Sequence, residues 1–371
     1  MGLQLNRIKF INFRNYHELD LDGLGRLTLF VGPNAVGKTN IVEGIQLITA
    51  QTSFRKPTVG QMIAQGSSFS RLDGWVADTS RDLRITLQLE EGKKKRFLNG
   101  KAKRAADIRG IIPSVIFTPD DLELARSASA PRRDALDALG AQLSANHHRI
   151  KSDYEKVVRG KNRLLREEAS PALIESMDEV LIVTGAQLTC YRATLFMRLA
   201  EAMEEYYKQI SGGNETFQAC YVPSWAEHDP TSTYSEIPSR DDARLQLQQA
   251  LHKRRQEEIA RRRAVVGPHA DHLEFFIDGR NAAQFGSQGQ RRSLVLAFKL
   301  AETALIETML DQKPILLLDD VMGELDASRR AALTSLACSE LQTFITATGM
   351  TNIEGDLVRN ADVIELPLQG K

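Results

Sequence analysis

The stretch RLTLFVGPNAVGKTNIVEGIQLI, residues 26–48, limits most strongly how this chain folds. It has the pattern of an apolar strand, a glycine-containing loop and an amphipathic helix, the setting in which G-x-x-x-x-G-K-[ST] forms a phosphate-binding loop, or P-loop. Glycines let backbone N–H groups point at phosphate oxygens, and the helix N-terminus adds the positive end of its dipole. The sequence therefore predicts a nucleotide site formed by Gly32, Pro33, Asn34, Ala35, Val36, Gly37, Lys38, Thr39 and Asn40.

A second segment, KPILLLDDVMGELD, provides the acidic partner of this loop. Ile315–Leu318 is a continuous apolar run, typical of a strand buried in a parallel sheet, and it ends at Asp319. In P-loop enzymes the acid at such a strand end holds Mg2+ with the loop hydroxyl, while the loop lysine bridges the β- and γ-phosphates. We therefore expect Thr39 and Asp319 to bind the metal. We expect Lys38 and Asp320, which would orient the attacking water, to be catalytic.

A third segment, FGSQGQRRSLVLAFKLAETALIETML, begins a long helix with small and polar residues and leads directly to the acidic strand. An ordinary serine-capped helix would also fit this start. The order of P-loop, small-residue helix start and acidic strand is similar to that of ATP-binding-cassette proteins, in which two subunits enclose ATP between one P-loop and the other subunit's signature. That resemblance implies a signature of Ser287, Gln288, Gly289 and Gln290, and a D-loop of Glu324, Leu325 and Asp326.

The remaining pattern predicts two lobes. Alternating residues in 3–13 and 18–30 indicate two strands ahead of the P-loop, and Asn99-Gly100 is typical of a hairpin turn. From about residue 130 to 210 the sequence changes to long amphipathic helices. We therefore expect an α/β fold, an ABC-type P-loop ATPase head with an inserted, mainly helical second lobe. The expected domains are 1–125 and 263–371 for the head and 126–262 for the insertion.

Composition narrows the setting. The 48 basic and 48 acidic residues cancel, so a nucleic-acid site requires local clustering of positive charge. The three cysteines, Cys190, Cys220 and Cys338, are scattered, which favours a reducing compartment over a disulfide framework. The N-terminus lacks a signal-peptide pattern, and we see no apolar run of the roughly 20 residues that a membrane helix needs. We therefore expect a cytoplasmic protein, associated with the nucleoid and without a membrane partner.

Beyond single motifs, the chain resembles the RecF family of bacterial recombination-repair ATPases, which is related to SMC heads. The resemblance extends over essentially the whole chain. Its carriers are INFRNYHELDLD, GPNAVGKTNIVEGI, PDDLELA, RRDALD, VVGPHADHLEF, SQGQRRSLVLAFKLAE and LLLDDVMGELD. The sequence departs from the family pattern at Ala270, at His272 and in the ARSASAP segment before Arg132.

This resemblance implies an ATP- and Mg2+-dependent DNA-binding protein with weak, DNA-stimulated ATPase activity. It implies a homodimer that forms with ATP and acts at single-strand gaps or duplex junctions. It further implies partnership with RecR and, indirectly, with RecO and RecA, whose loading it helps, and a part in the SOS response.

The DNA contacts have to come from local basic clusters. The first candidate lies on the predicted hairpin and consists of Lys93, Lys94, Lys95, Arg96, Lys101, Lys103 and Arg104. The second lies on a later helix and consists of Lys253, Arg254, Arg255 and residues 261–263. A solvated charged face is the alternative for either cluster. With few aromatic residues among these charges, contact with the duplex backbone is favoured over base stacking.

Three further residues have two interpretations each. Arg14, in NFRNY, either reaches the nucleotide or forms a surface salt bridge. His269 and Asp271 either line the nucleotide seam or form a capped turn after Gly267-Pro268.

The alternative functions are an SMC-like chromosome-maintenance ATPase and a nuclease-associated ABC-type ATPase. The first needs hundreds of coiled-coil residues, and the second needs an added acidic metal domain. We find neither in the sequence. A transporter ATPase would place the signature much closer to the P-loop than Ser287 is to Lys38.

Overall fold

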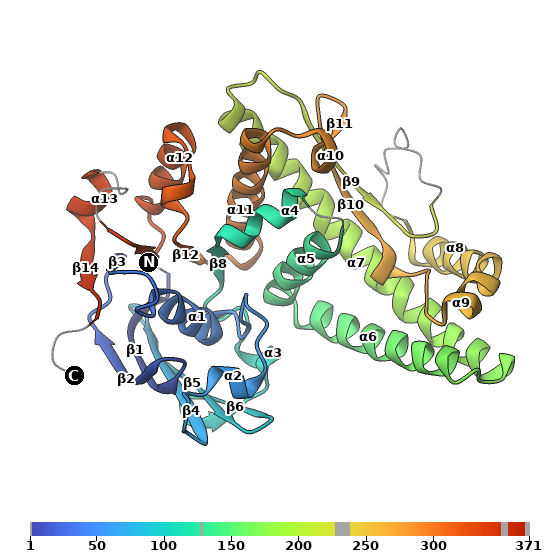
Figure 1. The fold of residues 1–371 in the computed structure, drawn as a ribbon, viewed down its shortest axis with the longest axis horizontal. Helices are drawn as coiled ribbons and strands as arrows, with labels where there is room; N and C mark the ends of the chain where they lie inside the picture. The colour runs from blue at the N-terminus through green and yellow to red at the C-terminus, as the bar shows by residue number, and fades with distance from the viewer. Residues whose placement is uncertain (1, 127–128, 227–237, 350–354, 368–371) are drawn as a thin grey trace. The chain divides into compact units, whose positions relative to one another are not determined.

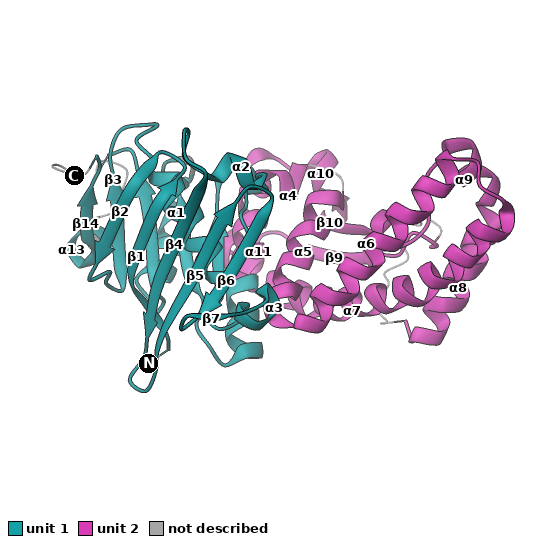
Figure 2. Ribbon diagram, turned by 90° about the horizontal axis from the view of Figure 1, so that it is seen from below, with its two compact units in different colours: residues 1–121, 302–371 teal, residues 122–301 magenta. Residues whose placement is uncertain are grey.

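The fold comes from a computed structural model, which describes all residues except 1, 127–128, 227–237, 350–354 and 368–371. The chain divides into two compact units, residues 1–121 with 302–371 and residues 122–301 (Figure 2). The first unit holds the P-loop and the acidic strand, and the second holds the long helices. The predicted class, an α/β head with a mainly helical insertion, is confirmed.

The first unit contains a five-stranded parallel sheet in the order β14-β3-β13-β12-β8. Three of its strands, β3, β12 and β13, are apolar and almost completely buried, as expected for a parallel sheet covered on both faces. The strands are β14 (Asp362–Glu365), β3 (Leu27–Val31), β13 (Thr343–Ala347), β12 (Ile315–Asp319) and β8 (Ser114–Phe117).

A second, six-stranded antiparallel sheet of this unit follows the order β2-β1-β4-β5-β6-β7. Its strands are β2 (Tyr16–Asp22), β1 (Gln4–Phe13), β4 (Phe69–Ala77), β5 (Asp82–Glu90), β6 (Lys93–Leu98) and β7 (Lys101–Ala102). Asn99 and Gly100 both have positive φ, 50° and 77°, which confirms the predicted hairpin turn between β6 and β7.

Helix α1 (Lys38–Thr49) packs against strands of both sheets, and one apolar core contains residues of all three (Figure 1). A Cβ at Gly44 of α1 would lie 2.3 Å from the ring of Phe10 on β1, so the helix and the strand approach as closely as glycine allows. The shorter helices of the unit are α2 (Val59–Met62), α3 (Ala105–Ile108), η3 (Met322–Glu324), α12 (Ala327–Ala337) and α13 (Gly355–Asn360), and η1 (Pro119–Leu122) crosses into the second unit at its last residue.

The second unit combines helices with a three-stranded sheet in the order β11-β10-β9. Its central helix, α7, packs against α6, α8 and β9. The helices are α4 (Glu123–Arg126), α5 (Ser129–Leu143), α6 (Ala145–Arg166), α7 (Pro171–Ser211), α8 (Arg240–Lys253), α9 (Arg255–Arg261), η2 (Pro268–Ala270) and α10 (Ala282–Phe285). The strands are β9 (Phe217–Val222), β10 (His272–Ile277) and β11 (Arg280–Asn281). Helix α11 (Gln288–Leu310) begins in this unit and ends in the first.

The contacts place the unit boundaries after residues 121 and 301, whereas the sequence analysis placed domain boundaries after 125 and 262. The difference at the second boundary has a physical reason. Strand β10 pairs with β9, so residues 272–277 belong to the sheet of the helical unit. The expectation of one strand over residues 18–30 was wrong, because β2 ends at Asp22 and β3 begins at Leu27 in a different sheet.

By length and composition α7 could cross a membrane, because an 18-residue window within its 41 residues has a mean hydropathy of 1.3. The apolar pattern of the sequence did not predict such a segment. Half of that window is buried within the protein, as in the core helix of a globular domain.

Candidate functional site

The P-loop joins the end of β3 to the start of α1 (Figure 1). Gly37, the residue before the helix, has φ 113° and offers no side chain to the first-turn N–H groups. A Cβ at this position would lie 2.6 Å from Asn15 Nδ2 and 2.7 Å from the hydroxyl of Tyr16. Both the backbone conformation and the available space therefore require glycine. The uncapped helix start leaves backbone donors for an anion.

Lys38 is folded back over this loop. Its Nζ donates to the carbonyl oxygens of Gly32 at 2.8 Å and Pro33 at 2.9 Å, and the residue is 6% exposed. A buried ammonium with carbonyl partners can exchange those partners for phosphate oxygens, which are stronger acceptors. The ammonium is therefore already held beside the predicted phosphate position.

Thr39 and Asp319 lie together although they are 280 positions apart in the chain. The Thr39 hydroxyl donates to Asp319 Oδ1 at 3.0 Å. The sheet explains this meeting, because β3 and β12 are parallel and both flank β13. Their carboxyl ends therefore share one edge of the sheet, where ligands of open α/β sheets bind.

Thr346, on the intervening strand β13, completes this contact and was missed in the sequence analysis. Its hydroxyl donates to Asp319 Oδ1 at 2.8 Å and accepts from the backbone N–H of Asp320 at 2.9 Å. Burial raises the pKa of the Asp319 carboxyl above its usual value, and the hydrogen bonds from Thr346 and Thr39 act in the opposite direction. Asp320 itself is exposed and has φ 55°, so its side chain lies at the open edge of the sheet.

The donors at this edge fit Mg2+, which binds oxygen ligands and is usually held by one or two carboxylates together with substrate phosphates. Thr39 contributes a hydroxyl and Asp319 a buried carboxylate, 3.0 Å apart. Among the described residues there is no group of three or more His, Cys, Asp and Glu side chains that could hold a metal alone. A metal at this edge would therefore depend on phosphate oxygens for further ligands.

Arg14 has partners that the sequence did not reveal. Its guanidinium donates to both carboxylate oxygens of Glu43, at 2.9 and 2.7 Å, and to the carbonyl oxygen of Gln61 at 2.7 Å. Glu43 is fully buried on α1, so this is an internal ion pair and not the surface salt bridge considered above. A direct contact of Arg14 with nucleotide stays a prediction.

Arg55 is a further cation of this edge that sequence reasoning missed. It donates to Asn40 Oδ1 at 2.7 Å, lies 3.4 Å from Glu43, and its charge favours the ionised form of Asp319. Its side chain remains 37% exposed. The signal that could have found it is its position in SFRK, shortly after the P-loop helix.

The predicted signature lies in the second unit, at the start of α11. The backbone N–H of Ser287 donates to Gln290 Oε1 at 2.8 Å, and the backbone N–H of Gln290 donates to Ser287 Oγ at 3.1 Å, which is a reciprocal capping box. The Gln290 amide also donates to Glu215 Oε1 at 2.9 Å, and Tyr207 donates to Glu215 Oε2 at 2.5 Å. The signature turn is thus fastened to the C-terminal end of α7.

The D-loop segment forms the turn η3 and the start of α12. The Asp326 side chain caps α12 by accepting from the backbone N–H of Arg329 at 3.0 Å, and Arg330 donates to the carbonyl oxygen of Leu325 at 2.8 Å. Glu324 is the last residue of η3. A role of these residues in a second subunit's site stays a prediction.

His269 and Asp271 lie inside the second unit. Asp271 is fully buried and accepts hydrogen bonds from the Tyr221 hydroxyl and, at 2.8 Å, from the backbone N–H of Ser224. His269 Nδ1 lies 2.6 Å from the Tyr154 hydroxyl, and burial lowers the pKa of its imidazole. Of the two interpretations, these contacts favour the structural one. Residues 127–128 of the ARSASAP segment lie outside the described residues.

The first basic cluster is divided between the two faces of β6. Lys94 and Arg96 are paired with the buried Leu89 and Leu87 of β5, so they share the inner face, and burial lowers the pKa of both cations. Lys93 and Lys95 lie on the outer face, whereas Lys101 is paired with Leu98 and therefore shares the face of Lys94 and Arg96. Lys101, Lys103 and Arg104, on the hairpin and the turn that follows, are all exposed. In the second cluster Arg254, Arg255, Arg261 and Arg262 all form ion pairs with carboxylates.

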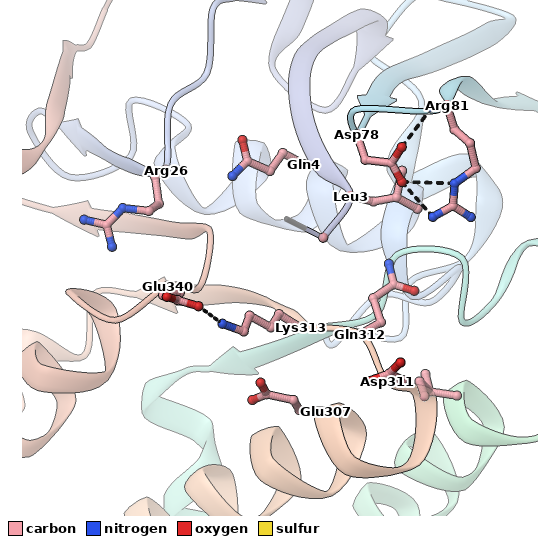
Figure 3. A pocket seen from close by; sticks show the side chains of 12 residues that line it. Leu3, Gln4, Arg26, Asp78, Arg81, Glu307, Asp311, Gln312, Lys313 and Glu340 are labelled. Carbon is pink, nitrogen blue, oxygen red and sulfur yellow. Dashed lines mark hydrogen bonds and ion pairs between the residues drawn. The ribbon is translucent and has the colours of Figure 1, made fainter.

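A cleft of about 910 Å³ lies elsewhere in the first unit (Figure 3). It is lined by residues near the amino ends of the parallel strands, such as Arg26 before β3 and Lys313 before β12. Lys313 pairs with Glu340, and Asp78 pairs with Arg81. Because the P-loop is at the carboxyl ends of the strands, this cleft is separate from the edge that holds Thr39 and Asp319.

Comparison with known proteins agrees with this geometry. Residues 4–359 match the family described as the RecF/RecN/SMC N terminal domain. A "DNA replication and repair protein RecF" of Heliobacterium modesticaldum is 34% identical over 355 residues, which cover 93% of this chain and 92% of the relative. A protein of the same name from Gloeobacter violaceus is 34% identical and covers 98% and 96%.

Solved structures give the same picture. The fold matches the recombination mediator protein RecF of the RecFOR pathway with ATP, at a TM-score of 0.86 and 29% identity over 96% of this chain and 94% of the other. It also matches an Smc head domain from Pyrococcus furiosus, at a TM-score of 0.53 and 15% identity over 98% and 93% of the two chains, which shows a shared fold.

Proposed function

Because this chain belongs to the RecF family of DNA replication and repair proteins, we propose that it is an ATP-dependent DNA-binding protein of recombinational repair. In this proposal ATP and Mg2+ bind at the P-loop, and two copies close on the nucleotide. The observation that carries it is the 3.0 Å contact of Thr39 with Asp319, which joins the P-loop to the acidic strand at one sheet edge.

Each residue of this edge has a definite task. The α1 N-terminus and Lys38 bind the β- and γ-phosphates, and Thr39 with Asp319 would hold Mg2+, which supplies charge neutralisation to the phosphates. Asp320 orients the attacking water from the end of β12, where its carboxylate is exposed. Nucleotide hydrolysis is slow in this proposal, because the exposed Asp320 carboxylate holds the attacking water in place only once the second subunit closes.

The second copy contributes the signature turn of Ser287–Gln290, whose hydroxyl and helix N-terminus suit the γ-phosphate of the first copy's nucleotide. A site divided between two copies links ATP occupancy to association, because each favours the other by the same free energy. Hydrolysis then separates the copies. The D-loop at Leu325 and Asp326 would lie along the same seam.

DNA is the proposed target of the closed dimer, at single-strand gaps or duplex junctions. The exposed cations of the hairpin, Lys93, Lys95, Lys101, Lys103 and Arg104, would contact backbone phosphates, which predicts strong salt dependence without sequence preference. RecR would bind the DNA-bound dimer, with RecO and RecA acting next, during the SOS response in the cytoplasm. These partners rest on the family to which the chain belongs.

The test measures mass by light scattering with and without ATP and Mg2+. We expect wild type to change from monomer to dimer, Lys38→Ala to bind no nucleotide, and Ser287→Arg to bind nucleotide but stay monomeric. A wild-type mass that ATP leaves unchanged would contradict the shared site. A companion gel-shift series on duplex, single-stranded and gapped DNA, at several salt concentrations, tests the DNA target. Equal retention of DNA by Lys38→Ala would show that the P-loop is incidental to DNA binding.

A further inference from the structure

Phe285 is the last residue of α10 and lies two positions before the signature serine. Its side chain is 67% exposed, the largest exposed fraction among the large hydrophobic residues that the structure describes. A single exposed apolar residue is ordinary on a protein surface. What distinguishes Phe285 is the combination of its surroundings and the way its backbone is held.

The chain segment that contains Phe285 carries no charge. Residues 281–290, NAAQFGSQGQ, contain no charged side chain, although 26% of the whole chain is charged. Gln284, Ser287 and Gln288 are exposed beside it. Protein interfaces differ from the remaining surface in this way, because their cores lack charges and are enriched in aromatic residues.

The backbone below Phe285 is fixed. Arg291 of α11 donates to the carbonyl oxygens of Ala282, at 3.4 Å, and Ala283, at 2.9 Å. A Cβ at Gly286 would lie 2.5 Å from the carbonyl oxygen of Ala282, so the turn from α10 into the signature is as tight as glycine permits. Phe285 and the signature therefore form one rigid element. Because the backbone that carries the ring is already ordered, binding there loses no backbone conformational entropy.

We propose that Phe285 is an apolar anchor of the interface between two copies of this chain. It packs against the sheet edge that carries the P-loop of the second copy when the signature turn binds at that edge. This inference rests on the proposed ATP-driven dimer and names the residue that contributes apolar contact to it. The anchor is uncharged, so it adds affinity that salt does not screen. A two-fold dimer contains the same contact twice.

The experiment compares three variants by light scattering over a range of protein concentrations with ATP and Mg2+. Phe285→Ala is expected to weaken dimerisation at least tenfold, which corresponds to about 1.4 kcal/mol. Phe285→Leu, which keeps much of the apolar area, should fall between it and wild type. Leu173→Ala, a matched loss of a 55% exposed side chain on α7, should dimerise as wild type does.

Two further measurements make the outcome decisive. Binding of a fluorescent ATP analogue to dilute monomer, and the urea midpoint, should be the same for Phe285→Ala and wild type, because an exposed side chain contributes little to either. Phe285→Ala that dimerises with the wild-type midpoint would overturn the anchor while the ATP-driven dimer stands. A loss of DNA binding with dimerisation intact would also overturn it. Wild type that stays monomeric would overturn the proposed function, and the anchor with it.

Discussion

Replacing Glu215 by alanine tests how the signature turn is held in place. Glu215 accepts from the Gln290 amide at 2.9 Å and from the Tyr207 hydroxyl at 2.5 Å, so it joins the signature to the end of α7. Hydrogen bonds to charged groups contribute about 1.5–3 kcal/mol each. Glu215 is half-buried, so we take about 1.5 kcal/mol, the lower end of that range, for the Gln290 contact.

Without that bond the turn of the free chain leaves the signature conformation, and closing the proposed two-fold dimer has to restore it in both copies, which costs about 1.5 kcal/mol per copy and about 3 kcal/mol in all. At about 1.4 kcal/mol per factor of ten, the dimer dissociation constant rises by about a hundredfold. Nucleotide binding to the monomer should not change, because the P-loop belongs to the other unit. We therefore expect Glu215→Ala to weaken dimerisation, measured by light scattering, and to leave the binding of a fluorescent ATP analogue unchanged.

Glu204→Ala removes an exposed carboxylate from α7, the helix to which Glu215 joins the signature, and serves as the control. Glu215→Gln keeps a carbonyl oxygen for the Gln290 amide, so it should restore part of the dimerisation. If Glu215→Ala and Glu204→Ala dimerised equally, the turn would not depend on its link to α7. A parallel loss of nucleotide binding in Glu215→Ala would instead indicate general misfolding.

Two predictions concern stability. Gly44→Ala places a methyl group 2.3 Å from the fully buried ring of Phe10. Overpacking costs about 1–3 kcal/mol of stability, and the higher helix propensity of alanine offsets about 1 kcal/mol at most, so we expect a lower urea midpoint. An unchanged midpoint would refute the close approach of the helix and the strand. Asp137→Asn breaks a buried pair with Arg192, bonded at 2.9 and 2.7 Å, and should cost about 3–5 kcal/mol. Asp137 is a buried carboxyl, and the Arg192 guanidinium holds its pKa well below the usual 3.8. The ion pair therefore stabilises the fold in full above pH 3.8, and this stabilisation is lost as the pH falls from 3.8 through the lower pKa of the folded state. Urea unfolding should therefore show a steeper loss of stability in acid for wild type than for the variant.

Local patterns in the sequence were sufficient to bring the P-loop and Asp319 to one edge of the sheet. The P-loop residues and Asp319 follow from glycine spacing and from an apolar run that ends in an acid, and parallel strands bring such ends to one edge. The sequence could not show Thr346 or the partner of Arg14, because both contacts depend on neighbours in space that are distant in the chain.

Strand β4 was missed for a different reason. A half-buried strand is recognised by alternation of apolar and polar residues, and β4 interrupts that pattern with a buried Asp73 and Gly74. Asp73 accepts from Arg71 at 2.7 Å, from Arg84 at 3.1 Å and from the Thr86 hydroxyl, so its burial depends on partners that the local pattern does not reveal. The second unit boundary escaped prediction because it falls within the continuous helix α11.

The pleat of β6 limits how much electrostatic free energy this strand can give to DNA binding. Successive side chains of a strand point to opposite faces, so only Lys93 and Lys95 of its four consecutive cations can reach one duplex together. Each neutralised phosphate releases about 0.9 counterion from B-DNA. The strand should therefore steepen the negative slope of log affinity against log salt by about 2. A count of all four cations would predict a change of slope about twice as large. Lys95 also has to leave Glu90, its ion-pair partner at 2.9 Å, which lowers even that gain.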